Sequence, residues 1–160
     1  MTKPDLSIVE KWLQKPHVKK YWDDGETWKE SYEKYVLRTS SDVVKQFLVY
    51  FQNRPIGYIQ YYWAGKVGDG WWKGYGDKIV GIDMYIGEED YLGKGHGTSF
   101  LKEFIQMLYN NLDIEKIIID PTPDNERAIR CYEKVGFIGQ KEIETPDGKA
   151  YLMEYHFNDV

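Results

Sequence analysis

The sequence predicts an α/β (α+β) fold in which helices flank a mixed central sheet. Apolar residues recur at helical spacing in four segments, and strand-length runs of β-branched and aromatic residues lie between them. Near the centre of the chain a strand, a glycine-rich loop, a helix and another strand follow one another, and this order implies that the two strands are parallel. The length fits one domain, so we expect a single unit over residues 1–160.

Two helices are expected in the N-terminal quarter. Residues 2–5 and 27–30 each fit a capping box, in which a threonine and an acidic residue three positions later satisfy free N–H groups at a helix start. Apolar side chains at helical spacing follow both boxes, over residues 6–13 and 28–36. Each of these segments is therefore predicted to form a short amphipathic helix.

A hairpin and a long loop should come next. Residues 44–51 and 56–63 are rich in β-branched and aromatic side chains, and the turn-forming residues 52–55 separate them. Residues 64–78 contain five glycines and two adjacent tryptophans, and this segment is too long for a tight turn. Loops of this kind usually contact a ligand or are disordered.

The C-terminal half supplies the remaining elements. In order, we expect a strand at 80–86, a loop at 92–98, a helix with an apolar face over 100–109, a strand at 114–120, a helix at 125–135, and a closing hairpin formed by 137–144 and 149–157. Gly136 should end the second of these helices, because a left-handed residue is favoured at that position.

The amino-acid composition limits which binding partners and which cellular compartment are expected. With 21 basic and 26 acidic residues, the net charge of -5 argues against a nucleic-acid partner and favours a cationic one. The single cysteine, Cys131, excludes an intrachain disulfide, and no segment resembles a secretion signal or a membrane span. His17, His96 and His156 lack the spacing of metal ligands, so no metal is expected. We expect a cytoplasmic protein, monomer or homodimer, that binds neither nucleic acid nor membrane.

A glycine-rich loop between a strand and a helix is the strongest local sign of a ligand. Gly93, Gly95 and Gly97 occupy alternate positions, so successive backbone N–H groups can form a concave anion site that the helix N-terminus reinforces. The spacing matches neither the dinucleotide fingerprint nor the P-loop. A phosphate group is therefore the expected ligand, held in a way that side chains would obstruct.

Residues 93–98 resemble the pyrophosphate loop of the GNAT acetyltransferase superfamily, and residues 120–137 resemble its second cofactor motif, N-x-x-A-x-x-x-Y-x-x-x-G-F. A closer resemblance, to the aminoglycoside 6′-N-acetyltransferases, covers nearly the whole chain. It is carried by residues 53–58, 68–72, 81–83, 120–121, 127–132 and 145–148. The resemblance implies the GNAT acyl-coenzyme A N-acyltransferase fold, with acetyl-coenzyme A as co-substrate and no metal.

The resemblance also implies a set of coenzyme contacts. These are Tyr85, Ile86, Leu92, Gly93, Lys94, Gly95, His96, Gly97, Thr98, Asn125 and Tyr132. Leu92 stands where the superfamily usually has Gln or Arg, but backbone amides make most of the contacts there. Asn125 would bind the pantetheine arm, and the phenol of Tyr132 would face the acetyl sulfur and protonate the departing thiolate. We expect the backbone N–H of Tyr85 to polarise the thioester oxygen.

The expected acceptor is a cationic amine, an aminoglycoside first of all. Carboxylates replace the hydration that ammonium groups lose, and aromatic faces cover sugar rings. The residues expected to line this pocket are Trp22, Asp69, Trp71, Trp72, Asp83, Asp120 and Asp147. Because only a neutral amine can attack a thioester, Asp83 is expected both to bind the amine and to accept its proton. Asp83 and Tyr132 are thus the predicted catalytic residues.

The predicted reaction is acetyl transfer to an aminoglycoside by direct attack, which confers antibiotic resistance. An acyl-enzyme is not expected, because Cys131 has no histidine partner. Two alternatives stay open: an acetyltransferase for a protein N-terminus, a polyamine or another small amine, and a non-catalytic module that binds coenzyme A or an aminoglycoside. The family's first strand is missing before residues 1–13, and Met84 stands where relatives often have Gln.

Overall fold

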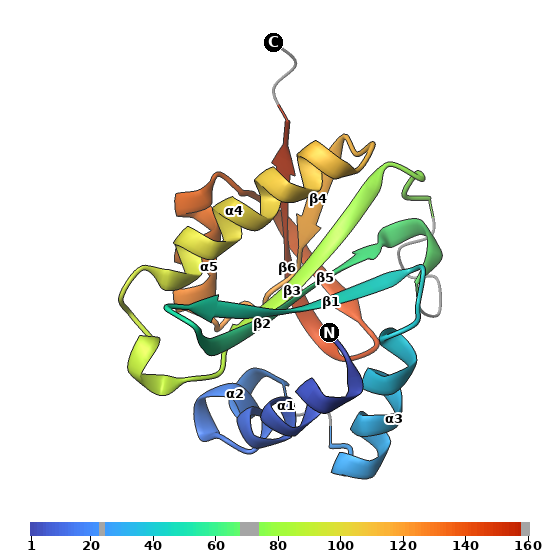
Figure 1. Cartoon of the computed structure of the whole chain (residues 1–160). Coiled ribbons are helices and arrows are strands. Elements are labelled where there is room, and N and C mark those ends of the chain that lie inside the picture. The colour runs from blue at the N-terminus through green and yellow to red at the C-terminus, as the bar shows by residue number, and fades with distance from the viewer. Residues whose placement is uncertain (23–24, 68–73, 158–160) are drawn as a thin grey trace.

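A six-stranded sheet with helices on both faces forms the frame of the molecule, as a computed structural model shows for residues 1–22, 25–67 and 74–157 (Figure 1). The strands are ordered β1-β2-β3-β4-β6-β5 across the sheet. Their bounds are β1 (Val44–Phe51), β2 (Arg54–Trp63), β3 (Ile79–Ile86), β4 (Lys116–Ile119), β5 (Ile138–Thr145) and β6 (Gly148–His156). The helices are α1 (Leu6–Leu13), α2 (Pro16–Trp22), α3 (Trp28–Arg38), α4 (His96–Asn111) and α5 (Glu126–Val135). The predicted mixed α/β fold is confirmed.

The two faces of the sheet carry different helices. Side chains alternate between the faces along each strand. Ile59 and Ile82 therefore pack in the cluster that includes α4 and α5. Tyr58 and Tyr85 point to the opposite face of the same strands and pack against α1, α2 and α3. Figure 1 shows these three N-terminal helices gathered on one side of the sheet and α4 with α5 on the other. In the described residues no strand precedes α1.

The predicted parallel pair, β3 and β4, joins the two halves of the sheet only over a short stretch. Ile79 to Gly81 of β3 pair with Lys116 to Ile118 of β4, whereas β3 continues to Ile86 along its antiparallel neighbour β2. Every other pair in the sheet is antiparallel. Beyond Gly81 the two strands diverge, and the far end of β3 leaves its β4 side unpaired within the described part of the chain.

Three local features differ from the sequence prediction. Helix α2 was not predicted, and it begins at Pro16, whose fixed φ suits the first position of a helix. The β1–β2 turn consists of Gln52 and Asn53 alone, with φ values of 49° and 64°, so Pro55 lies in β2 and not in the turn. Helix α4 begins at His96, inside the segment predicted to be a loop.

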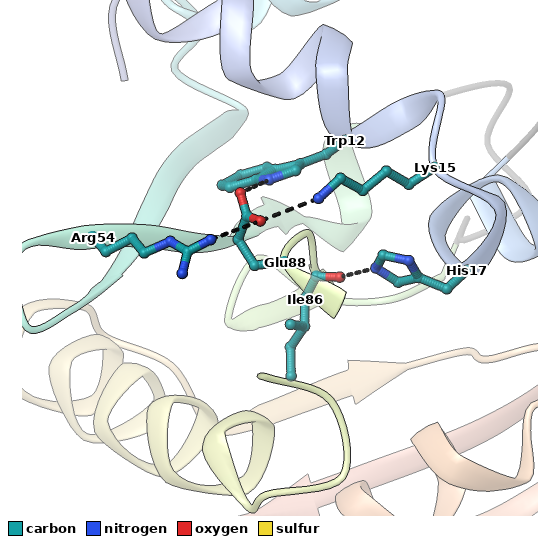
Figure 2. Close-up of polar contacts among 6 residues, drawn as sticks. All are labelled: Trp12, Lys15, His17, Arg54, Ile86 and Glu88. Carbon is teal, nitrogen blue, oxygen red and sulfur yellow. Dashed lines mark hydrogen bonds and ion pairs between the residues drawn. The ribbon is translucent and has the colours of Figure 1, made fainter. Parts of the chain in front are cut away.

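One half-buried carboxylate ties the N-terminal helices to the end of β3 (Figure 2). Glu88 accepts hydrogen bonds from Trp12 Nε1 at 2.9 Å, Lys15 Nζ at 3.1 Å and Arg54 Nη2 at 3.2 Å. Burial alone would raise the pKa of Glu88, but the bonds from Trp12 and Lys15 and the charge of Arg54 lower it below its ordinary value. Trp12 lies in α1, Lys15 in the connection to α2 and Arg54 at the start of β2, so Glu88 joins the first helix and the β1–β2 hairpin to the end of β3.

Substitution of Glu88 by Gln is expected to lower the free energy of unfolding by about 1–3 kcal/mol at neutral pH, because a charged acceptor of three donors is lost. The folded-state pKa lies below the unfolded one, so the wild-type advantage is present above the unfolded pKa and disappears as the pH falls through the folded pKa. Urea denaturation at several pH values measures this. The exposed Glu89→Gln is the control, and equal losses in both variants would contradict the assignment.

Candidate active site

A small cavity fills the gap where β3 and β4 diverge. Its volume is about 130 Å³. It is lined by Tyr21, Trp22, Ile82, Asp83, Met84, Ile119, Asp120, Pro121, Thr122, Asn125 and Tyr132. The ends of both strands, the start of α5 and the end of α2 therefore meet at one point. Asp83 and Tyr132, the predicted catalytic residues, and Asn125, a predicted contact of the pantetheine arm, are brought together here.

A larger cavity of about 760 Å³ lies beside the first one. Helices α2 and α3, strand β2 and the β5–β6 turn contribute to its walls. Its acidic lining residues are Glu26, Asp83, Asp120 and Asp147, and its basic ones are Lys20, Lys34, Arg38 and Lys149. Both cavities include Asp83 and Asp120, so these two carboxyl groups stand at the junction between them.

The glycine-rich loop ends in an open helix terminus. Gly93 and Gly95 have φ values of 69° and 82°, a left-handed conformation that glycine adopts without strain. Gly95 is the N-cap of α4, and helix geometry leaves the N–H groups of His96, Gly97 and Thr98 without intrahelical acceptors. These donors and the helix dipole suit an anion such as a diphosphate.

Gly97 has a second role within this loop. It is buried, and a Cβ added there would lie 3.5 Å from Cys131 Sγ and 3.7 Å from side-chain atoms of Met84 and Ile86. These are ordinary van der Waals distances, so Gly97 marks the place where the first turn of α4 packs beside both α5 and β3. The helix terminus is held beside the gap between β3 and β4.

The histidines have structural surroundings. The His96 ring packs edge-on to Phe51 and against Tyr91, with ring centroids 4.5 Å and 5.1 Å away. His17 Nε2 lies 3.0 Å from the carbonyl oxygen of Ile86 at the end of β3 (Figure 2). Within residues 1–22, 25–67 and 74–157, no group of histidine, cysteine and carboxylate side chains could hold a metal ion. No helix in those ranges is long and apolar enough to cross a membrane.

The register of β2 and β3 determines which backbone donors face the gap. Gly87 donates its N–H to the Ile56 carbonyl at 2.8 Å, and hydrogen-bonded pairs recur at every second residue of an antiparallel ladder. Tyr85, opposite Tyr58, therefore directs its N–H toward β2, away from the gap. The N–H groups of Met84 and Ile86 point to the open side. Met84 was not among the predicted oxyanion donors, because the sequence does not show which alternate residues of a strand form hydrogen bonds with its neighbour.

Two interacting carboxyl groups form the electrostatic centre of the site. Asp83 Oδ2 accepts a hydrogen bond of 2.8 Å from Gln60 Nε2. Burial raises the pKa of Asp83 above its ordinary value, and Gln60 and the charge of Arg38 oppose that rise. Burial, together with the negative charges of Asp83 and Asp147, raises the pKa of Asp120 to about 8. The pair therefore favours a bound cation, which would stabilise both ionised forms.

Tyr132 and Cys131 on α5 are both held in their protonated forms. Burial, reinforced by Cys131, Asp83 and Asp120, raises the pKa of the buried Tyr132 far above its ordinary value, so its phenol keeps its proton. Burial also raises the pKa of the Cys131 thiol, whose sulfur lies 3.5 Å from Thr98 Oγ1. A protonated thiol is a poor nucleophile, and a phenol is a proton donor.

The remaining predicted residues fall in several places. Asn125 caps α5 by accepting from the Ala128 N–H at 3.3 Å, which leaves its side-chain amide N–H groups as donors. Trp22 packs against Tyr85 with ring centroids 4.7 Å apart and lines both cavities. Leu92 is half-buried, whereas Lys94 and Asp147 are exposed. Asp69, Trp71 and Trp72 lie outside the described residues.

Sequence reasoning missed several lining residues, namely Tyr21, Tyr35, Arg38 and Gln60. Gln60 lies in the predicted strand 56–63 among aromatic side chains, and a polar residue at a buried strand position was the available signal. The others come from helices whose contribution to the pocket depends on tertiary packing.

A helix terminus suited to an anion, a gap between splayed parallel strands and a pocket with paired carboxyl groups beside a buried phenol fit the requirements of an acyl-transfer enzyme. A family model described as an acetyltransferase (GNAT) domain matches residues 2–145. Aminoglycoside N(6′)-acetyltransferase type 1 of Klebsiella pneumoniae is 39% identical over 158 residues, which cover 96% of this chain and 79% of the relative. The chain belongs to the GNAT acetyltransferases, and within them to the family of these aminoglycoside enzymes.

Other comparisons agree with this assignment. A kanamycin resistance protein of Rhizobium radiobacter is 45% identical over 84 residues, 52% of this chain and 78% of the relative. The crystal structure of aminoglycoside acetyltransferase AAC(6′)-Ib with coenzyme A and kanamycin superposes with a TM-score of 0.89 at 38% identity, covering 98% of this chain and 91% of that one. The predicted GNAT fold and the prediction of an acetyl-coenzyme A-dependent N-acetyltransferase are confirmed.

Proposed function

We propose that the protein transfers the acetyl group of acetyl-coenzyme A to an amino group of an aminoglycoside, and that it thereby confers resistance. The carrying observation is the junction of the two cavities at Asp83 and Asp120, beside Tyr132. The larger cavity has room for a bulky ligand, and because four basic side chains balance its four carboxylates, the support for a cationic acceptor comes from Asp83 and Asp120 at the junction and not from the net charge of the lining. The smaller one suits the pantetheine arm, because it opens between strands that no longer pair.

The proposed chemistry is direct attack. The neutral amine attacks the thioester carbonyl carbon, and the proton that leaves the nitrogen goes to Asp83. The C–S bond then breaks, the sulfur takes the proton of Tyr132, and the resulting phenolate at once regains a proton from solvent, because the pKa of Tyr132 lies far above its ordinary value. Backbone N–H groups of Met84 or Ile86 stabilise the negative charge on the carbonyl oxygen. The half-buried Cys131, whose thiol has a raised pKa, favours this route over an acyl-enzyme.

Thiol release in the presence of acetyl-coenzyme A tests the proposal. The wild-type protein would be assayed with kanamycin and tobramycin, and in parallel with spermidine and with a peptide bearing a free N-terminus. We expect release with at least one aminoglycoside and a raised inhibitory concentration in an expressing strain. Thiol release with the polyamine or the peptide alone would show that the acceptor is not an aminoglycoside. Binding of coenzyme A without thiol release in any assay would show that the protein is a binding module and not an enzyme.

Binding of an aminoglycoside at neutral pH is expected to release protons. Asp120, with a pKa of about 8, carries a proton in the free protein at pH 7 and ionises when an ammonium group binds beside it. Calorimetry in buffers of different ionisation enthalpy measures the release. Asp120→Asn should release about one proton fewer than the wild type, with the difference disappearing above about pH 9. Asp124→Asn, exposed in the same connection, is the matched control, and an equal change in both variants would contradict the role of Asp120.

Two further inferences accompany this function. The single cysteine and the use of acetyl-coenzyme A support a cytoplasmic enzyme. Monomer and homodimer are both compatible with the enclosed position of the site within one chain, and sedimentation analysis distinguishes them.

A further inference from the structure

Two glutamines stand out as buried polar side chains in the described part of the molecule. Gln46 on β1 and Gln60 on β2 are 5% and 6% exposed. Burial of an amide costs free energy unless its hydrogen-bonding groups are satisfied, so each must serve a network. Gln60 lies directly opposite Asp83 in the β2–β3 ladder, on the same face of the sheet.

The amide of Gln60 has only one favourable orientation. Its Oε1 accepts a hydrogen bond from Arg38 Nη1 at 3.3 Å and lies 2.6 Å from the Tyr58 hydroxyl, while its Nε2 donates to Asp83 Oδ2 at 2.8 Å. If the amide flipped, its oxygen would face the carboxylate and its NH₂ group would face the guanidinium, which can only donate. Arg38 therefore keeps the donor of Gln60 directed at Asp83.

We propose that Gln60 is a positioning residue for acetyl transfer, whose locked amide holds Asp83 Oδ2 and leaves Oδ1 to receive the acceptor amine. This inference rests on the proposed function, in which Asp83 takes the proton of the attacking nitrogen. An untethered aspartate in a wide cavity would rotate about its side-chain bonds. A tethered one keeps a lone pair directed at the junction of the two cavities, as proton transfer requires.

The donated hydrogen bond also favours the ionised form of Asp83. Several charged or titratable groups act on Asp83 from the elements around it. These are Arg38 on α3, Tyr58 on β2, Asp120 after β4 and Tyr132 on α5. Removal of the Gln60 donor leaves the others in place, so it should raise the pKa of Asp83 and move the acidic limb of the rate profile to higher pH.

Gln46 provides a matched control. It is as buried as Gln60, and its Oε1 also lies near the Tyr58 hydroxyl, at 2.9 Å, so the single hydrogen of that hydroxyl serves one of the two glutamines at a time. Its Nε2, however, donates to the Tyr35 carbonyl at 3.1 Å, and within the described residues no hydrogen bond joins Gln46 to Asp83. Loss of either glutamine should therefore cost similar packing and hydrogen bonding, while only loss of Gln60 removes the tether on the carboxylate.

The experiment compares the wild type with Gln60→Met, Gln60→Glu and Gln46→Met. Two readouts are measured: the carbon-13 NMR titration of the Asp83 carboxyl group, assigned with Asp83→Asn, and the pH dependence of kcat/KM with kanamycin. We expect Gln60→Met to raise both the pKa from the NMR titration of Asp83 and the pKa of the acidic limb of kcat/KM by about one unit. At pH values below that limb, kcat/KM should then be about tenfold lower than in the wild type. Gln60→Glu should raise them further because it adds a like charge, and Gln46→Met should leave both unchanged.

The outcomes separate this inference from the proposed function. Unshifted titrations in a folded Gln60→Met protein, or an equal shift in Gln46→Met, would overturn the positioning role. If Gln60→Met fails to fold, Gln60→Glu serves in its place because it keeps the shape of the side chain. An unshifted Asp83 titration in Gln60→Glu would also overturn the positioning role. A wild type that acetylates no aminoglycoside refutes the function, whereas the NMR titration still reports whether Gln60 controls Asp83.

Discussion

Substitution of Asp83 by Asn should lower kcat/KM for acetyl transfer by on the order of 10²–10⁴-fold, the range that a general base contributes. Asparagine keeps the size of the side chain but cannot accept a proton from the attacking amine. The affinity for acetyl-coenzyme A should stay unchanged, since the proposed diphosphate contacts come from the start of α4. Steady-state kinetics with kanamycin and a fluorescence titration of the coenzyme measure the two quantities.

A control for Asp83 comes from another aspartate. Asp90 is exposed in a 3₁₀ turn (Glu89–Tyr91) and lines neither cavity, so Asp90→Asn should be fully active. Activity of Asp83→Asn within a few-fold of the wild type would remove Asp83 as the base. A simultaneous loss of coenzyme affinity would show instead that the substitution disturbs the cavity.

Replacement of Tyr132 by Phe is expected to reduce kcat by on the order of 10²–10³-fold, because the departing thiolate loses its proton donor. The pKa of Tyr132 lies far above its ordinary value, so the phenol is protonated throughout the range in which the enzyme can be assayed. The ratio of wild-type to variant rates should therefore be the same at every pH between about 6 and 9. Rates measured across that range test this expectation.

Tyr155→Phe is the control for this substitution. Tyr155 packs against Phe137 with ring centroids 5.5 Å apart and lines neither cavity, so its hydroxyl has no part in the proposed reaction. If the ratio of the wild-type rate to the Tyr132→Phe rate changed steeply with pH, the group at this position would have to ionise in the assayed range. A ratio near one would exclude the phenol as the acid. A non-catalytic binding module would show no turnover for either variant to lose.

Local patterns predicted much of the fold. The two capping boxes lie at the expected threonines, with Asp5 and Glu30 accepting from Thr2 and Thr27. The hairpin of β1 and β2 and the parallel pair of β3 and β4 also follow the prediction. These features depend on residues close in sequence or on connection length, which is why sequence patterns indicate them.

The sequence by itself determined the order of helices and strands apart from α2, the glycines of the proposed anion site and the residue types that acyl transfer to an amine requires. Only the tertiary structure decided how those parts act on one another. The pairing phase of β2 and β3 turns the N–H of Tyr85 away from the gap, and it places Gln60 opposite Asp83. The docking of α3 adds Arg38 to the same network. Hydrogen bonds between strands and helices distant in sequence set these relations, because burial and register depend on the whole packed sheet and leave no local pattern.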